Sequence, residues 1–279
     1  MSGGGPTRLA ARVVAWALVV VLAGFVAFCG IWRAQGGRWE RVETPSMGTV
    51  APVGTLLWVK PVPFDTLRPG DFISFHPPGR PGVTFSHRVL ARHADGTLST
   101  KGVIPAPDPW RLGPGDLVGA VRMRWWGAGW LVTAAPLLIL GMLVIGVVRT
   151  LLRPALRLPV TVVLVAVVAG LALAVYRPLD SAVQLGFRTV AGGGADATYV
   201  GTGLLPVRVD AVAGDHVVLA AGQVGRVHVP VADATGHFRV RLSPVIPSWF
   251  WAGLVGLCFA PALASTVRRR KNICDDMSR

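Results

Sequence analysis

Three side chains between residues 46 and 108 have the chemistry of a serine hydrolase: the hydroxyl of Ser46, the imidazole of His87 and the carboxylate of Asp108. Amide hydrolysis by a serine needs a base that takes the hydroxyl proton, a group that orients this base, and donors for the developing oxyanion. The three residue types supply the base, its orienting group and the nucleophile. Their spacing alone does not single them out, because most domains of this size contain some serine, histidine and aspartate.

Each of the three residues also has a simple structural interpretation. Ser46 follows a proline and could cap a turn, His87 precedes an arginine and could lie in a basic surface patch, and Asp108 stands between two prolines and could form an Asx turn. Lys101 is a rival base, since a lysine that is desolvated can lose its proton and serve a serine nucleophile. Lys60 is a weaker rival.

The residues around these side chains form an ordered series of short phrases. The series is Thr44-Pro-Ser-Met47, Leu67-Arg-Pro-Gly-Asp-Phe-Ile-Ser-Phe75, Ser86-His-Arg-Val89, Thr100-Lys-Gly102 and Asp116-Leu-Val-Gly-Ala-Val121. In this order the phrases resemble the membrane-bound type I signal peptidases. The likeness is to the branch of archaea, the endoplasmic reticulum and some Gram-positive bacteria, in which histidine replaces the general-base lysine. It covers about residues 40–124, a little under a third of the chain.

The resemblance implies a role for each candidate residue. Ser46 is then the nucleophile, with its own backbone N–H in the oxyanion hole, His87 is the general base, and Asp108 orients the imidazolium. The resemblance also implies a mainly-β catalytic domain of signal-peptidase type. The expected partners are exported precursor proteins with signal peptides, which carry small residues one and three positions before the cut. No organic cofactor and no metal are expected.

The chain departs from the family pattern at three places. Gly48 and Thr49 stand where proline is common, Thr55 stands where a Gly-Asp pair is usual, and Val103 replaces the first aspartate of a Thr-Lys-Gly-Asp phrase. A triad that loses its aspartate slows by orders of magnitude, so Asp108 has to fill the orienting role alone. The departures allow a second hypothesis, a catalytically degenerate surface protein whose second exported domain binds or assembles partners.

Composition points away from an ordinary soluble domain and toward a lipid bilayer. Of the 279 residues 52% are hydrophobic and only 15% are charged, and the mean hydropathy is +0.54. The net charge of +14 comes from 28 Arg and Lys residues spread along the chain, so nucleic acid is not an expected partner. Three cysteines in unsuitable places predict no disulfide, and six scattered histidines predict no metal site.

Four stretches are apolar and long enough to cross a hydrocarbon core, which needs about 20 residues. They are residues 13–32, 127–148, 158–176 and 248–267. The short flanks 1–12, 149–157 and 268–279 carry arginine or lysine, which is retained on the cytoplasmic side. We therefore predict a multi-pass protein of the cell membrane with cytoplasmic termini. A cleaved signal peptide at 13–32 is the alternative, and a transporter is not expected because the spans lack buried ionisable residues.

The two exported segments, 33–126 and 177–247, are both expected to be β structure. In the second, apolar residues alternate with polar or small ones over 207–211, 227–231 and 238–242, which predicts a small antiparallel, sandwich-like domain. In the first, the strand candidates are 56–59, 72–75 and 117–121, and residues 56–58 could either dip into the bilayer interface or belong to the core. Only 13 residues separate Trp32 from Ser46, a reach of about 45 Å at most. The nucleophile is therefore expected near the outer leaflet.

Overall fold

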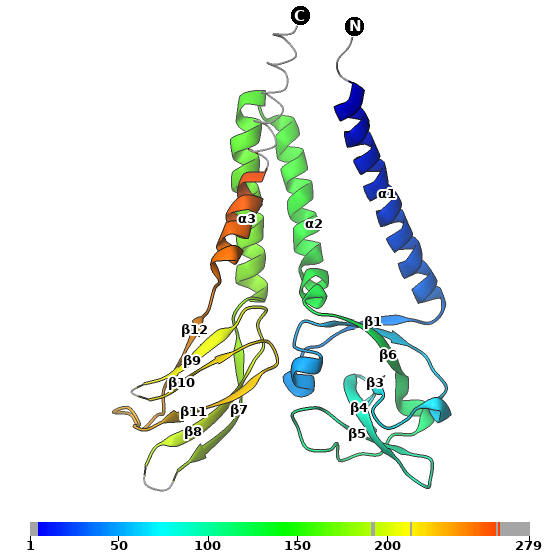
Figure 1. The fold of residues 1–279 in the computed structure, drawn as a ribbon, viewed down its shortest axis with the longest axis vertical. Helices are drawn as coiled ribbons and strands as arrows, with labels where there is room; N and C mark the ends of the chain where they lie inside the picture. Colours follow the sequence, from blue (N-terminus) through cyan, green and yellow to red (C-terminus); the bar gives the residue numbers. More distant parts are fainter. Residues whose placement is uncertain (1–4, 191–192, 213, 261, 263–279) are drawn as a thin grey trace, which may run out of the picture.

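The computed structural model describes residues 5–190, 193–212, 214–260 and 262. Apolar helices occupy one end of the molecule and two β domains occupy the other (Figure 1). The first β domain follows helix α1 (Gly5–Ala34) along the chain, and the second follows helix α3 (Pro154–Tyr176). Helices α1, α2 and α3 extend from the same side of the two β domains (Figure 1). Both β domains therefore lie next to the same end of the helices.

Within the described residues, three helices are long and apolar enough to cross a membrane. They are α1, α2 (Ala128–Leu151) and α3, and their most apolar windows have mean hydropathies of 2.6 to 2.7. At most 6% of any of these windows is buried by the rest of the protein. Apolar surface of this extent needs cover from another medium, which a bilayer supplies.

The fourth expected span, residues 248–267, is described only in part. An apolar helix runs over Ser248–Ala260, which alone is too short to cross a hydrocarbon core. Residues 261 and 263–267 lie outside the described residues. Among the residues that the structure describes, three helices are of spanning length, and the fourth predicted span lies partly outside those residues.

Helices α2 and α3 form a tight hairpin. Only Leu152 and Arg153 separate them. Pro154 can start α3 at once, because the first residue of a helix makes no intrahelical hydrogen bond with its N–H and proline has none. The connection is thus shorter than the expected loop at 149–157. The helices also approach closely, since a Cβ atom on Gly141 would lie 2.5 Å from the side chain of Val168. This packing holds the two helices as one unit.

The first β domain is built on one six-stranded antiparallel sheet. Its strands are β1 (Arg38–Arg41), β2 (Leu56–Lys60), β3 (Phe72–Phe75), β4 (Phe85–Arg92), β5 (Leu98–Lys101) and β6 (Leu117–Trp125), in the spatial order β1-β2-β6-β3-β4-β5. Register shifts in three of the strand pairs mark bulges, which bend a sheet and increase its twist. Ile73 and Phe75 lie in one buried cluster, and Met47 and Leu57 lie in another.

Residues 56–58 belong to the core of this domain and not to an edge that dips into the bilayer. Strand β2 is an inner strand between β1 and β6, and Trp58 is 1% exposed. The Trp58 ring meets Phe28 and Trp32 of α1, with ring centroids 5.4 and 5.3 Å apart. It also meets Trp125 of β6 at 4.7 Å. This aromatic cluster attaches the end of α1 to the sheet.

The second β domain packs two three-stranded antiparallel sheets against each other. The strands of one sheet are, in spatial order, β10 (His216–Leu219), β9 (Val207–Ala211) and β12 (Val240–Pro244). Those of the other are β11 (Val224–Val229), β8 (Ala195–Gly201) and β7 (Ala182–Thr189). Val207 and Val209 of the first sheet share a buried cluster with Val227 and Val229 of the second. The described part of 177–247 therefore agrees with the expected antiparallel, sandwich-like domain.

Candidate active site

Ser46 lies in a short 3-10 segment, η1 (Pro45–Val50), that follows strand β1. Thr44 is still extended, with φ −119° and ψ 152°, and Pro45 then begins the 3-10 turn. The fixed φ of proline suits the first position of a helical turn. The change of direction places Ser46 at a corner of the chain, from which its hydroxyl reaches the neighbouring strand β4.

His87 lies in the middle of β4, and its side chain is only 3% exposed. Its ring makes edge-on contacts with Phe75 and Phe85, with ring centroids 6.2 and 5.6 Å apart. Imidazole Nε2 lies 3.1 Å from Ser46 Oγ. The aromatic packing thus restricts the imidazole to an orientation in which it reaches the hydroxyl.

Asp108 extends the line of hydrogen bonds on the other side of the imidazole. Its Oδ2 lies 2.7 Å from His87 Nδ1, and its side chain is 7% exposed. Thr100 Oγ1 donates a 2.6 Å hydrogen bond to the same oxygen, and Asp108 N donates a 2.9 Å hydrogen bond to Thr100 O. Because a carboxylate only accepts, this pattern assigns the proton to Nδ1 and leaves Nε2 to accept the proton of Ser46 Oγ.

The structure therefore brings together the three residues singled out in the sequence. The order hydroxyl, imidazole and carboxylate is the order that proton transfer from a serine requires, and both distances are within hydrogen-bond reach. Thr44 Oγ1 lies 3.4 Å from Ser46 Oγ. Its hydroxyl is thus near enough to donate to the oxyanion that forms on the carbonyl oxygen when Ser46 attacks the carbonyl carbon.

The rival bases lie elsewhere. Lys101 is on β5 and pairs with Arg88 in the sheet register, whereas the ring nitrogen near Ser46 belongs to His87. Lys60 Nζ donates a 2.7 Å hydrogen bond to Gln35 Oε1, next to the end of α1. Neither lysine takes the place of the imidazole.

Two departures from the family pattern, Thr55 and Val103, take no part in the hydrogen bonds that join Ser46, His87 and Asp108. Thr55 is 1% exposed, and its hydroxyl donates to Pro52 O at 2.7 Å, which closes a turn before β2. Val103 is exposed, and its apolar side chain cannot hydrogen-bond to the imidazole. The single carboxylate of Asp108 is the one that meets the imidazole.

A cavity of about 360 Å³ opens beside Ser46. Its walls are residues 41–44 and 46–47 on one side and residues 82–86 on the other. Both walls are short lengths of chain next to strands, so the space between them suits an extended peptide that places side chains into the cavity.

Behind this cavity lies a polar cluster that sequence reasoning did not find. Ser86, which lines the cavity, is 2.9 Å from Ser74 between their hydroxyl oxygens. Next to them is the carboxyl of Glu40, whose Oε2 is buried without a hydrogen-bond partner in the described structure. Burial raises the pKa of Glu40 above its usual range, and the nearby hydroxyls of Ser74 and Ser86 oppose this shift only in part.

Sequence reasoning also missed the roles of Thr44 and Thr100. Thr100 belongs to the Thr-Lys-Gly phrase, and Thr44 stands two residues before the nucleophile, so both were within the quoted motifs. The signal that assigns them is spatial, because each hydroxyl is identified by the atom that it faces. Glu40 had a weaker signal, a lone acid in a strand that is otherwise basic and aromatic.

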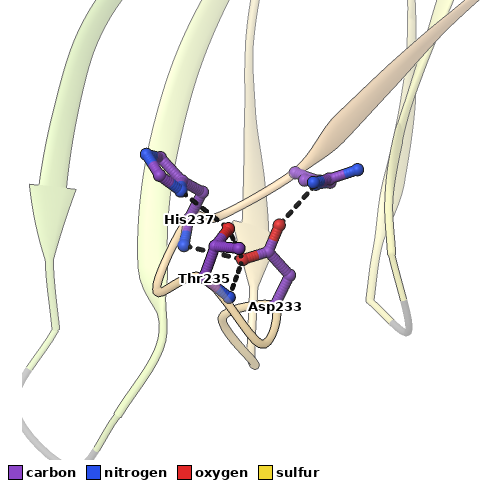
Figure 2. Close-up of polar contacts among 4 residues, drawn as sticks. Asp233, Thr235 and His237 are labelled. Atoms are coloured by element: carbon purple, nitrogen blue, oxygen red, sulfur yellow. Dashed lines mark hydrogen bonds and ion pairs between the residues drawn. The ribbon is translucent and has the colours of Figure 1, made fainter.

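A second hydroxyl, imidazole and carboxylate lie together in the other β domain, from Thr235, His237 and Asp233, with different hydrogen bonding (Figure 2). Asp233 Oδ1 accepts hydrogen bonds from Thr235 N, Thr235 Oγ1 and His237 N at 2.8, 2.6 and 3.0 Å, and Arg239 Nε donates to Oδ2. The hydrogen bonds from Thr235, above all that of its hydroxyl, hold the pKa of Asp233 well below its usual range.

The hydroxyl proton of Thr235 thus goes to a carboxylate and not to an imidazole. His237 Nδ1 lies 2.9 Å from Thr235 Oγ1, but the hydroxyl has no proton left to give it. All three residues belong to one exposed turn. This cluster closes a turn and is not a second nucleophile.

Among the described residues, no group of three or more His, Cys, Asp or Glu side chains could hold a metal ion. No protein-family model matches this chain, and a search of curated proteins finds no significant similarity. The chemistry of the site is therefore argued from its geometry.

Proposed function

We propose that this protein is a membrane-bound serine endopeptidase that removes signal peptides from exported precursor proteins. The observation that carries the proposal is the continuous line from Ser46 Oγ through the His87 ring to Asp108 Oδ2, at 3.1 and 2.7 Å. The resemblance of the phrases around these residues to type I signal peptidases supplies the substrate class. The three apolar helices of spanning length support a location in a membrane.

The reaction follows from the hydrogen bonds. Ser46 Oγ attacks the scissile carbonyl carbon while its proton passes to His87 Nε2, and Asp108 stabilises the imidazolium that results. The carbonyl oxygen becomes an oxyanion, to which the Thr44 hydroxyl and the backbone N–H of Ser46 donate. The imidazolium then protonates the leaving amine, and the C–N bond breaks to leave the signal peptide as an ester on Ser46.

Water completes the cycle by the same route in reverse. His87 Nε2 takes a proton from a water molecule, the hydroxide attacks the ester carbonyl, and the proton returns to Ser46 Oγ as the C–O bond breaks. The products are a mature protein with a new amino terminus and a signal peptide with a free carboxylate. No other reactant is consumed.

Contacts between the site and the helices support cleavage at the membrane surface. Arg41, at the end of the strand that leads to Ser46, donates to Thr133 Oγ1 of α2 at 3.0 Å, and its guanidinium lies over the ring of Trp130, 5.6 Å from the centroid. Gly129 N donates to Gly54 O at 2.9 Å. The active site is thus attached directly to the first turns of α2. A signal peptide presents its cleavage site where its apolar helix ends, so an active site beside the first turns of an apolar helix suits such a substrate.

The direct test is cleavage of a precursor by purified protein in detergent. We expect the wild-type protein to release a mature product with a single new amino terminus, and Ser46→Ala to lose this activity. Ser99→Ala is the matched control, because it removes a hydroxyl from β5 of the same domain that bonds only to Ala91 O, at 3.5 Å. Equal cleavage by wild type and Ser46→Ala would exclude Ser46 as nucleophile. Absence of cleavage by folded wild-type protein would favour a degenerate surface protein.

A further inference from the structure

The second β domain touches the chain segment that carries the nucleophile. The turn at residues 220–223, between β10 and β11, lies against η1. A Cβ atom on Gly222 would lie 2.3 Å from both C and O of Gly48, and 2.6 Å from Thr49 N. These are backbone atoms, which cannot move aside as a flexible side chain can. Two main chains from different domains therefore meet here, two residues after Ser46.

The turn at 220–223 is itself firmly held. Gly222 N donates to Gly201 O at 2.7 Å, Gly201 N donates to Gln223 O at 3.0 Å, and Gln223 N donates to Ala220 O at 3.0 Å. The side chain of Gln223 closes the turn, because its Oε1 accepts from Ala220 N at 3.1 Å. Gly201 ends strand β8, and its neighbour Val200 is fully buried. The turn is thus anchored to the core of the second domain.

The chain that leads to Asp108 also contacts η1. Ile104 N donates a 3.0 Å hydrogen bond to Ser46 O. A Cβ on Gly48 would meet the side chains of Ile104 and Val103 at 3.5 Å and Gly222 O at 3.4 Å. The segment that carries Ser46 therefore has contacts with both β domains.

Met47 packs this segment onto the buried cluster that contains Leu57, but the segment itself lies outside the sheet, so its exact position depends on further contacts. It is a 3-10 turn outside the sheet, and Gly48 has a φ of 51°, a left-handed conformation that glycine adopts without strain but does not favour over others. The hydrogen bond from Ser46 Oγ to His87 Nε2 is 3.1 Å long, so a shift of about 1 Å would break it. A misplacement of that size costs about 100-fold in rate.

We propose that the turn at 220–223 is a positioning element for Ser46, so that the two exported domains form one catalytic unit. The contact with Gly48 blocks the outward movement of η1 and keeps the hydroxyl within reach of the imidazole. The proposal rests on the proposed function only for its effect on catalysis. Its effect on the mobility of η1 is independent of what the site does.

The test compares Gly222→Ala with Gly236→Ala in the full-length protein in detergent. Both glycines have a left-handed φ, +74° and +79°, and both belong to the second domain, but Gly236 has no atom within 4 Å of an added Cβ. The two variants therefore share the backbone strain, and only Gly222→Ala presses on η1. Gln223→Ala is a milder variant, which loosens the turn without adding an atom at the contact.

Two measurements are made on each variant: hydrogen exchange over residues 44–52 and 102–106, and kcat and KM for precursor cleavage. We expect Gly222→Ala to speed exchange in these two segments and to lower kcat by about 10- to 100-fold with little change in KM. Gln223→Ala should give a smaller change of the same kind. Gly236→Ala should stay within twofold of wild type in kcat and show unchanged exchange in these segments.

The outcomes separate this proposal from the proposed function. If wild-type protein cleaves no precursor but Gly222→Ala still speeds exchange in η1 selectively, the peptidase assignment fails and the positioning contact stands. If Gly222→Ala and Gly236→Ala match each other in exchange and in kcat, the contact does not position Ser46. Exchange that rises uniformly over both domains in Gly222→Ala, with Gln223→Ala unchanged, would overturn it as well.

Discussion

Asp108→Asn removes a negative charge from the active site and keeps the size of the side chain. Asp108 Oδ2 accepts hydrogen bonds from His87 Nδ1 at 2.7 Å and from Thr100 Oγ1 at 2.6 Å. An asparagine can accept both only if its carbonyl oxygen takes the place of Oδ2, because its amide nitrogen donates. The variant therefore changes either the charge alone or the charge and the tautomer of His87.

These two cases bound the loss of activity. If the carbonyl faces His87, the tautomer survives and only the charge assistance is lost; hydrogen bonds to charged groups contribute about 1.5–3 kcal/mol against about 0.5–1.5 kcal/mol for neutral ones. The difference corresponds to about a tenfold fall in kcat. If the amide nitrogen faces His87, the proton moves to Nε2 and Ser46 loses its base, which lowers kcat by about 10⁴-fold. We expect a fall between these limits.

The assay is the initial rate of precursor cleavage at saturating substrate, with thermal unfolding of each variant measured in the same detergent. Asp95→Asn is the control, because Asp95 makes a similar pair of hydrogen bonds, from Thr97 N at 3.0 Å and Thr97 Oγ1 at 2.6 Å, but in an exposed turn. It should keep kcat within twofold of wild type. If Asp108→Asn also stays within twofold while His87→Ala is inactive, Asp108 does not orient the imidazole and the reasoning is wrong.

Three further predictions concern the surroundings of the site. Thr100→Val removes one of the two donors to Asp108, so kcat should fall about tenfold, and Thr100→Ser should restore it in the same cleavage assay. Burial raises the pKa of Glu40, so the stability that its protonated form contributes is complete below its usual pKa of 4.5 and is lost as the pH rises through the raised pKa. The Tm of Glu40→Gln minus that of wild type should therefore increase over this pH range, and a constant difference would contradict the burial of Glu40. A methyl group on Gly54 would lie 1.9 Å from Trp130 Nε1, so Gly54→Ala should lower the free energy of unfolding by about 1–3 kcal/mol, measured as a lower Tm.

Periodicity and hydropathy predicted the long helices and some strands of this fold, because both patterns depend only on residues that are close together in the sequence. Runs of apolar residues gave α1, α2 and α3, and strict alternation gave strands such as β9. No strand candidate was given for β1, β4, β5, β7, β8 or β10. Strand β1 is short and reads Arg-Trp-Glu-Arg, so its polar residues conceal the pattern, and its place in the sheet comes from pairing with β2.

The three candidate catalytic residues came from motif phrases, not from spacing. Their convergence depends on the pairing of β3 with β4, which places His87 opposite Ile73, and on the hydrogen bonds between Thr100 and Asp108, which direct the carboxylate at the imidazole. Such contacts link residues far apart in the chain. The roles of Thr44 and Thr100 follow from the same contacts, so no single-sequence pattern assigns them.

The contact between Gly222 and Gly48 was beyond prediction for a different reason. It joins two domains separated by two helices, and it depends on the absence of a side chain at both positions. Gly48 was noted only as a departure from the family pattern, and glycines at turns are common in any β domain, so nothing in the sequence indicates that Gly48 meets Gly222. Of the two interpretations of residues 56–58, the order of strands favours the core, because it puts β2 inside the sheet.

The most direct measurement of the central proposal is the product formed when precursor is cleaved in the presence of hydroxylamine. An ester on Ser46 partitions between water and this stronger nucleophile, so part of the released signal peptide should carry a C-terminal hydroxamate, detected by mass spectrometry. We expect the hydroxamate fraction to rise with hydroxylamine concentration for the wild-type protein, and Ser46→Ala to give neither product. Cleavage that yields only the free carboxylate at every hydroxylamine concentration, and that persists in Ser46→Ala, would contradict acyl-enzyme catalysis by Ser46.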